Sequence, residues 1–192
     1  MRMRRTISVS LLSLSAACAH APMASEAPRP SAGARVAQWP LRAGHDLNGI
    51  EPVVRRAAGV SATTQAKTLF VQRLEDLDVG ILTFNNQPGG FTLTAGHGSS
   101  WASCTGRVTS AGSDVIVARI VQRQRRYLVV VGPQWATSIR VPRGDQPPAT
   151  VNLRFGAGVF TISPRVTGPV SLFNGHTLLA NASPSCTALL PG

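Results

Sequence analysis

The feature of this sequence that most restricts its fold is a series of short β-strand patterns that starts at Val79 and runs to the C-terminal residues. Each pattern is rich in Val, Ile, Thr or Phe, which favour extended structure, and clusters of Gly, Pro, Asn and Ser separate one from the next. The sequence therefore predicts an all-β fold: a single β-sandwich or small barrel of roughly eight to ten short antiparallel strands.

Three stretches indicate where individual strands should lie. Residues 113–121 are apolar on both faces of an extended chain, which predicts a strand in the middle of the fold. Residues 151–155 alternate between apolar and polar side chains, which predicts a half-buried strand that ends with Phe155. The stretch Phe173-Asn174-Gly175-His176 has the composition of a tight hairpin turn.

The N-terminal part of the chain has the pattern of a secretory signal peptide. Basic residues at positions 1–5 precede an apolar run from Ile7 to Ala17 and then several small residues, which is the order that export signals follow. The apolar run is too short to cross a bilayer as a helix. We therefore expect residues 1–19 to be a signal peptide and the protein to be exported, to the extracellular space or the cell envelope.

Two ways of processing this signal fit the sequence. The stretch Ala17-Cys18-Ala19 obeys the small-x-small rule, and cleavage after it would release a chain that begins at His20. Residues 14–18 instead resemble a bacterial lipobox, in which the signal ends before the cysteine and Cys18 becomes a lipidated first residue. Leu14 then stands one position too early for the usual pattern. In this second case the lipid anchor is the expected attachment to a membrane.

The remaining chain divides into two parts. Residues 20–47 are rich in Ala, Pro and Ser and have no hydrophobic period, which predicts a disordered tether. Residues 48–192 then form the all-β domain, which is large enough for one core.

The first residues of this domain carry weaker signals. Residues 48–59 can form a short helix with Asn48 as its N-cap, Pro52 in its first turn and Gly59 at its end. Residues 61–77 fit either a helix or a strand of a hairpin, and the β-rich sequence that follows favours the hairpin.

Two cysteines follow the signal region, Cys104 and Cys186. An even number of cysteines in an exported chain predicts a disulfide. This one would close a loop of about 80 residues and stabilise the fold by roughly 4 kcal/mol in the loop-entropy model. Two buried free thiols are the alternative.

The net charge of +11 does not by itself identify a partner. All but one of the 19 basic residues are arginines, a bias that we attribute to a GC-rich coding sequence. The densest group lacks the interleaved aromatics and the basic helix of nucleic-acid binders; it consists of Arg119, Arg123, Arg125 and Arg126. We therefore expect no nucleic-acid partner and keep an anionic cell-envelope surface as a candidate partner.

Three segments are similar to parts of the trypsin-like serine proteases. They are "LTAGHG" around His97, "SDVIVARI" around Asp114, and "GPVSLFNGHTLLA" from Gly168. The resemblance implies His97 as general base and Asp114 as the acid that orients it. It also places Val166 where the family has its nucleophilic serine, and valine cannot attack a carbonyl group. The short chain between His97 and Asp114 also departs from the family.

Other catalytic or metal-binding patterns are missing from the sequence. It contains no Gly-x-Ser-x-Gly elbow, no phosphate-binding loop, and no His-Glu-x-x-His or Cys-x-x-Cys motif. Three histidines follow a glycine, His45, His97 and His176, but Gly-His is also an ordinary turn pair. We therefore expect no metal site and no cofactor.

These features together predict an exported bacterial module, of the envelope or secreted, that binds or supports rather than catalyses, with its ligand unspecified. The alternative is a degenerate or inactive domain related to the trypsin-like proteases. In the first interpretation no residue is catalytic, and the candidate surface is aromatic with neighbouring arginines. Its residues are Trp101, Trp135, Tyr127, Arg125 and Arg126.

Overall fold

The computed structural model describes residues 35–36, 38–43, 47–61, 64–109, 114–164, 166 and 168–191. The predicted signal peptide, Cys18, most of the predicted tether and His45 lie outside these residues. The described part contains one helix, α2 (Leu47–Ala57), and thirteen strands in three sheets.

The strands are grouped as follows. The first sheet has the order β1 (Arg42–Ala43), β2 (Ala66–Leu74), β3 (Leu77–Phe84), β4 (Gly90–His97) and β5 (Ser100–Arg107). The central sheet has the order β10 (Ala157–Ile162), β7 (Arg125–Val131), β6 (Ile116–Gln122) and β13 (Thr187–Leu190). The third sheet has the order β12 (Thr177–Ala182), β11 (Val170–Asn174), β8 (Ser138–Arg143) and β9 (Gln146–Asn152). All pairs are antiparallel except β1 with β2 and β13 with β6.

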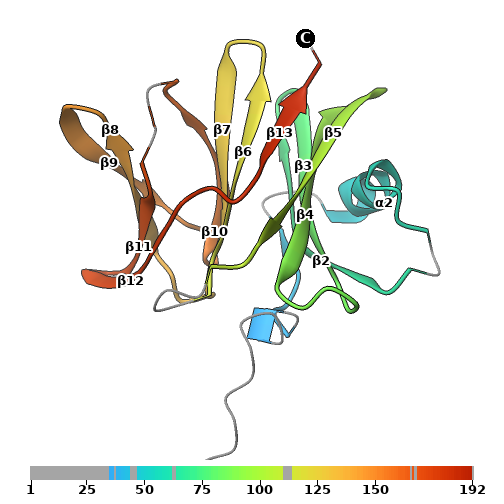
Figure 1. Cartoon of the computed structure of the whole chain (residues 1–192), viewed down its shortest axis with the longest axis horizontal. Coiled ribbons are helices and arrows are strands. Elements are labelled where there is room, and N and C mark those ends of the chain that lie inside the picture. The colour runs from blue at the N-terminus through green and yellow to red at the C-terminus, as the bar shows by residue number, and fades with distance from the viewer. Residues whose placement is uncertain are drawn as a thin grey trace, which may run out of the picture.

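The three sheets are stacked in layers, and helix α2 adds a fourth (Figure 1). One core, which includes Phe70, Phe91 and Ile120, lies between the first and central sheets. A second core, which includes Leu128 and Ile139, lies between the central and third sheets. The all-β prediction is confirmed, but a single sandwich of eight to ten strands is wrong. The reason is that β6 and β7 are apolar on both faces, so they need a sheet on each side.

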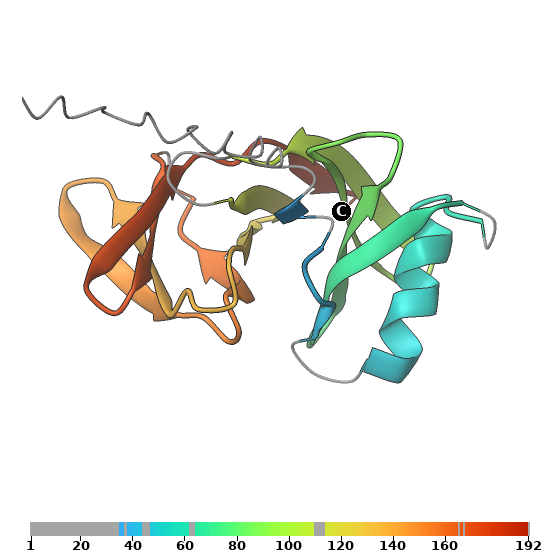
Figure 2. The ribbon, with the colours of Figure 1, turned by 90° about the horizontal axis from the view of Figure 1, so that it is seen from below.

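Helix α2 covers the outer face of the first sheet, away from the other two (Figure 2). Ile50 and Val54 are fully buried against the sheet, and Gly80 on β3 leaves room for the Val54 side chain. The helix ends at Ala57, and the predicted terminating residue, Gly59, lies two positions later with φ of +70° and donates to Arg56 O at 3.0 Å.

The start of the helix differs from the prediction. Because α2 begins at Leu47, Asn48 lies inside the helix and Pro52 lies in its second turn. Pro52 has no N–H, so one hydrogen bond to the carbonyl of Asn48 is missing close to the N-terminal end.

The predicted hairpins form. Residues 66–84 fold as β2 and β3 joined at Glu75-Asp76, so the hairpin interpretation of residues 61–77 holds. The chain also turns at Gly175-His176, where Gly175 has φ of +57°.

The strand predicted at 151–155 is displaced. Strand β9 begins at Gln146, five residues earlier, and ends at Asn152. Phe155 lies in a turn with 61 % of its surface exposed, because the chain must reverse there to place β10 in the central sheet.

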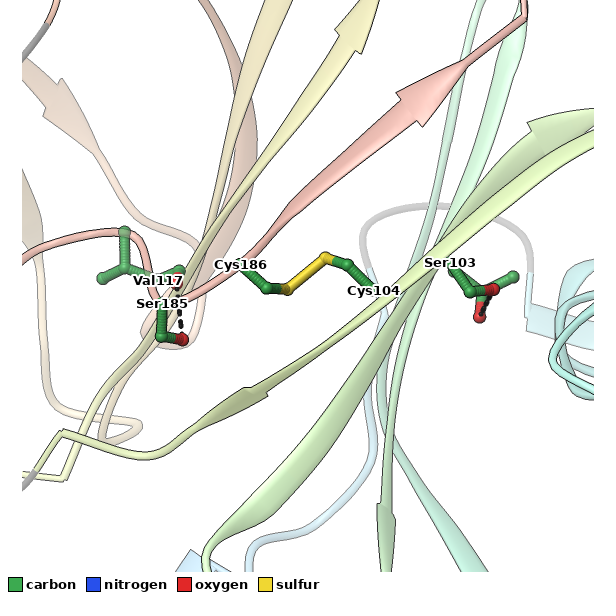
Figure 3. The surroundings of a disulfide bond; sticks show 6 residues. Ser103, Cys104, Val117, Ser185 and Cys186 are labelled. Atoms are coloured by element: carbon green, nitrogen blue, oxygen red, sulfur yellow. Dashed lines mark hydrogen bonds between the residues drawn. A yellow bond between two sulfur atoms is a disulfide. The ribbon is translucent and has the colours of Figure 1, made fainter.

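The disulfide between Cys104 and Cys186 is confirmed, with the two Cα atoms 5.8 Å apart. Cys104 lies on β5, and Cys186 immediately precedes β13, so the bond joins the first sheet to the edge of the central sheet (Figure 3). Beside it, the backbone N–H of Ser185 donates to Val117 O at 2.9 Å, and the N–H of Arg119 donates to Cys186 O at 2.9 Å. The disulfide therefore fixes β13, a four-residue strand, in parallel register on β6.

We expect the double variant Cys104→Ser/Cys186→Ser to lose about 2–5 kcal/mol of unfolding free energy, because the unfolded chain gains loop freedom. Urea denaturation of the oxidised protein and of the variant measures this difference. Equal midpoints and slopes would show that β13 is held without the disulfide.

Candidate functional site

A pocket of about 630 Å³ opens between strands β8, β9 and β10. We call it the β9–β10 pocket. Its floor is apolar and consists of Val141, Ala149, Val151, Phe160, Ile162 and Val166. Its rim is polar and exposed and consists of Arg143, Gly144, Asp145, Gln146, Thr161 and Ser163. The volume lies within the range of small-molecule sites.

The pocket exists because two sheet edges meet there. Strand β9 is the edge of the third sheet, and β10 is the edge of the central sheet. Pro147 and Pro148 on β9 cannot donate hydrogen bonds, so they block the addition of another strand on that edge. The second core is consequently open to solvent on this side instead of being closed by a further strand.

Two arginines of the central sheet hold the loop that borders the pocket. Arg119 donates from Nη2 to Val166 O at 3.1 Å, and Arg126 donates from Nη1 to Pro164 O at 2.8 Å. Val166 also donates its backbone N–H to Ser163 O at 3.1 Å. Pro164 and Val166 are therefore held beside the pocket by the central sheet.

The lining combines apolar side chains with charged ones. Neither histidine nor cysteine occurs among its lining residues. Arg143 and Asp145 place one charge of each sign on the rim. The pocket can accept an apolar body with a polar or zwitterionic end.

The two polar residues of the protease resemblance lie far apart. His97 ends β4 and pairs with Ser100 at the start of β5, whereas Asp114 lies beyond the other end of β5, next to the Thr109–Val115 bridge. Since β5 has eight residues, the two are separated by roughly 25 Å along the strand. The structure does not bring His97 and Asp114 together.

Asp114 instead binds Arg35, which is 79 positions earlier in the chain. Both carboxylate oxygens accept hydrogen bonds, from Arg35 Nε at 2.7 Å and from Nη2 at 2.9 Å. This bond raises the pKa of Arg35 above its ordinary value, so the guanidinium stays charged. The pair ties the first described residues to the start of β6.

Val166, which stands at the position of the protease nucleophile, is a core residue. Val166 is only 4 % exposed and packs in the second core. The same segment therefore supplies apolar floor to the β9–β10 pocket rather than a nucleophile.

The two described histidines lie in different sheets. His97 lies on the first sheet and His176 on the turn between β11 and β12 of the third sheet, with the central sheet between them. In the described part of the chain, no group of three potential metal ligands occurs.

The predicted aromatic surface is divided among three places. Trp101 packs beside α2, and its Nε1 donates to Gly98 O at 2.8 Å. Tyr127 is buried in the core between the first and central sheets. Trp135 alone of the three is on the surface, 61 % exposed.

The four arginines that are close together in the sequence have different environments in the structure. Arg125 forms an ion pair with Asp76 at 3.4 Å. Arg119 and Arg126 donate hydrogen bonds to the backbone beside the pocket, and Arg123 lies in the β6–β7 turn with φ of +49°.

The sequence analysis did not predict the β9–β10 pocket. The two consecutive prolines of β9 were a signal for an edge strand.

No protein family, curated protein or solved structure matches the chain. No helix among the described residues is long and apolar enough to span a membrane.

We expect Asp114→Asn to lower the melting temperature by about 2–4 °C, because it removes the charge that Arg35 binds in a buried position. Differential scanning calorimetry measures the change. His97→Ala is the matched comparison, and we expect it to leave the melting temperature unchanged because His97 is exposed. An Asp114→Asn melting temperature equal to that of the parent protein would contradict a stabilising role for the pair.

Proposed function

We propose that the protein is an exported, non-catalytic binding module whose ligand site is the β9–β10 pocket. The observation that carries the proposal is the pocket itself, which combines an apolar floor with a charged rim at the open edge of two packed sheets. The hydrogen bonds from Arg126 to Pro164 O and from Arg119 to Val166 O hold these two residues beside the pocket, which favours binding without rearrangement.

Two observations support the export part of the proposal. The N-terminal residues have the order of charge, apolar run and small residues of an export signal. The Cys104–Cys186 disulfide is of the kind that persists in oxidising compartments. Mass spectrometry of the protein from an exporting host tests this part. A chain that starts at Cys18 with acyl groups, or one that starts near His20, supports export, and an uncut chain contradicts it.

The ligand class follows from the lining. The floor is aliphatic apart from one aromatic ring, Phe160, so we expect the ligand to place an acyl or aromatic group against it. The rim offers both a cation, Arg143, and an anion, Asp145, so the polar end of the ligand should remain near solvent.

The probe anilinonaphthalene sulfonate, an aromatic anion, tests the pocket. We expect Ala149→Trp to reduce its enhanced fluorescence by about tenfold at fixed concentration, because an indole would fill the space that the ligand occupies. Thr150→Trp is the matched control, since the neighbouring side chain points to the other face of β9 and is exposed. Near-UV circular dichroism verifies that both variants remain folded. Equal dye fluorescence in both would remove the pocket as the site.

A fluorophosphonate probe tests the non-catalytic part. Ser100 is the serine opposite His97 in the strand register, but Asp114 binds Arg35 and cannot orient that histidine. We therefore expect no labelling of the native protein. Labelling that His97→Ala abolishes would favour the protease-related alternative.

A further inference from the structure

Two large aromatic side chains are exposed on neighbouring turns at one end of the molecule. Trp135 lies in the loop between β7 and β8, and Phe155 lies in the turn between β9 and β10. Each has 61 % of its surface exposed. Together with the exposed Arg154, we call them the aromatic tip.

The two turns are fastened to each other. The N–H of Gly132 donates to Gly156 O, and the N–H of Leu153 donates to Thr137 O, each at 2.8 Å. A side chain at Gly156 would collide with the carbonyl oxygen of Pro133. The tip is therefore a fixed surface, with its aromatic side chains on turns that are bonded to one another.

Phe155 occupies a backbone conformation that disfavours it. Arg154 and Ala157 exchange two backbone hydrogen bonds around Phe155-Gly156, and these two residues have φ of +50° and +72°. This is a type I′ hairpin turn, whose first central position prefers Asn, Asp or Gly. A bulky side chain at positive φ is costly, yet this one gains no burial in return. Strain without burial indicates that the exposed ring itself has a role.

Arg154 adds a guanidinium group to the aromatic tip. The guanidinium carbon of Arg154 lies 5.7 Å from the centre of the Phe155 ring.

The described chain also begins at this end. Ile116 at the start of β6 pairs with Val131 at the end of β7, so Asp114 and the loop that carries Trp135 lie at the same end of the central sheet (Figure 1). Arg35 is bound to Asp114 there. Cys18 precedes Arg35 by 17 positions, so a lipidated Cys18 would lie within about 60 Å of this end even with the chain fully extended.

We propose that the aromatic tip is a membrane-docking surface that binds a bilayer containing anionic phospholipid. Trp135 and Phe155 enter the boundary between headgroups and acyl chains, where aromatic side chains are favoured, and Arg154 lies beside the lipid phosphates. The β9–β10 pocket then faces away from the bilayer, because Thr161 and Ile162 lie at the far end of β10, opposite the start of β7. The docking site is independent of the pocket.

Co-sedimentation with vesicles tests the proposal. The protein carries Cys18→Ser, so that no acyl chain contributes, and is mixed with vesicles of phosphatidylglycerol and phosphatidylcholine or of phosphatidylcholine alone. We expect partitioning into the mixed vesicles to be about tenfold stronger and to weaken with salt. We expect Arg154→Gln to weaken it about fivefold, and Trp135→Ala/Phe155→Ala by about tenfold or more.

Phe155→Asn separates docking from folding. Asn suits the type I′ position, so we expect the melting temperature to stay or to rise, while partitioning into mixed vesicles falls several-fold. Leu189→Ala is the matched control, since Leu189 is 69 % exposed but pairs with Val121 near the other end of β6. We expect it to bind vesicles like the parent protein.

Three outcomes would overturn the proposal. Tip variants could bind mixed vesicles as the parent does, or Leu189→Ala could lose as much binding as they do. In the third outcome, the protein binds neither vesicle type and instead binds an insoluble cell-wall glycan through Trp135 and Phe155. The tip would then be a surface on which sugar rings stack. A failure of the dye assay at Ala149 leaves these results unchanged, so the two sites are judged separately.

Discussion

The hairpin of β6 and β7 is buried on both of its faces, and the rest of the structure depends on that burial. Ile120, Tyr127 and Val129 point into the first core, and Leu128 and Val130 point into the second. An antiparallel pair with two apolar faces cannot be solvated on either side. The chain therefore supplies one sheet before this hairpin and another after it, and the C-terminal strand returns to pair with β6.

The layered arrangement creates two ends with different chemistry. At the end of the β6–β7 hairpin turn, arginines of the central sheet bind the backbone of the loop beside Val166 and so shape the β9–β10 pocket. At the other end, the chain enters beside Asp114, and turns fastened by Gly132 and Gly156 expose two aromatic rings. A module with a ligand pocket at one end and a membrane-docking tip at the other would present its ligand away from the bilayer.

The resemblance to trypsin-like proteases shows how local sequence can mislead. The segment around His97 is a strand that enters a tight turn, and the segment around Asp114 is the start of a central strand. Both patterns are common consequences of β structure. Whether they form a catalytic pair depends on where the strands run, and here β5 separates them by its whole length. The carboxylate of Asp114 accepts hydrogen bonds from Arg35, 79 positions away in the sequence. No local sequence pattern indicated this pair.

The sequence by itself determined the strand content, the hairpins at 66–84 and 173–176, the end of the helix near Gly59 and the pairing of the only two cysteines in the described chain. The strands, the hairpins and the helix end follow from local side-chain alternation and turn residues. The disulfide follows from the number of cysteines. The number of sheets, the pocket between β9 and β10 and the partners of Arg35, Arg119 and Arg126 were decided by tertiary structure alone. These features depend on contacts between sheet edges, loops and side chains that are far apart in the sequence. The local sequence pattern of an edge strand does not say which sheet will lie next to it. Phe155 shows the limit most clearly, because its alternation with Val151 and Leu153 predicted burial, whereas the reversal of the chain into the central sheet placed its ring in solvent.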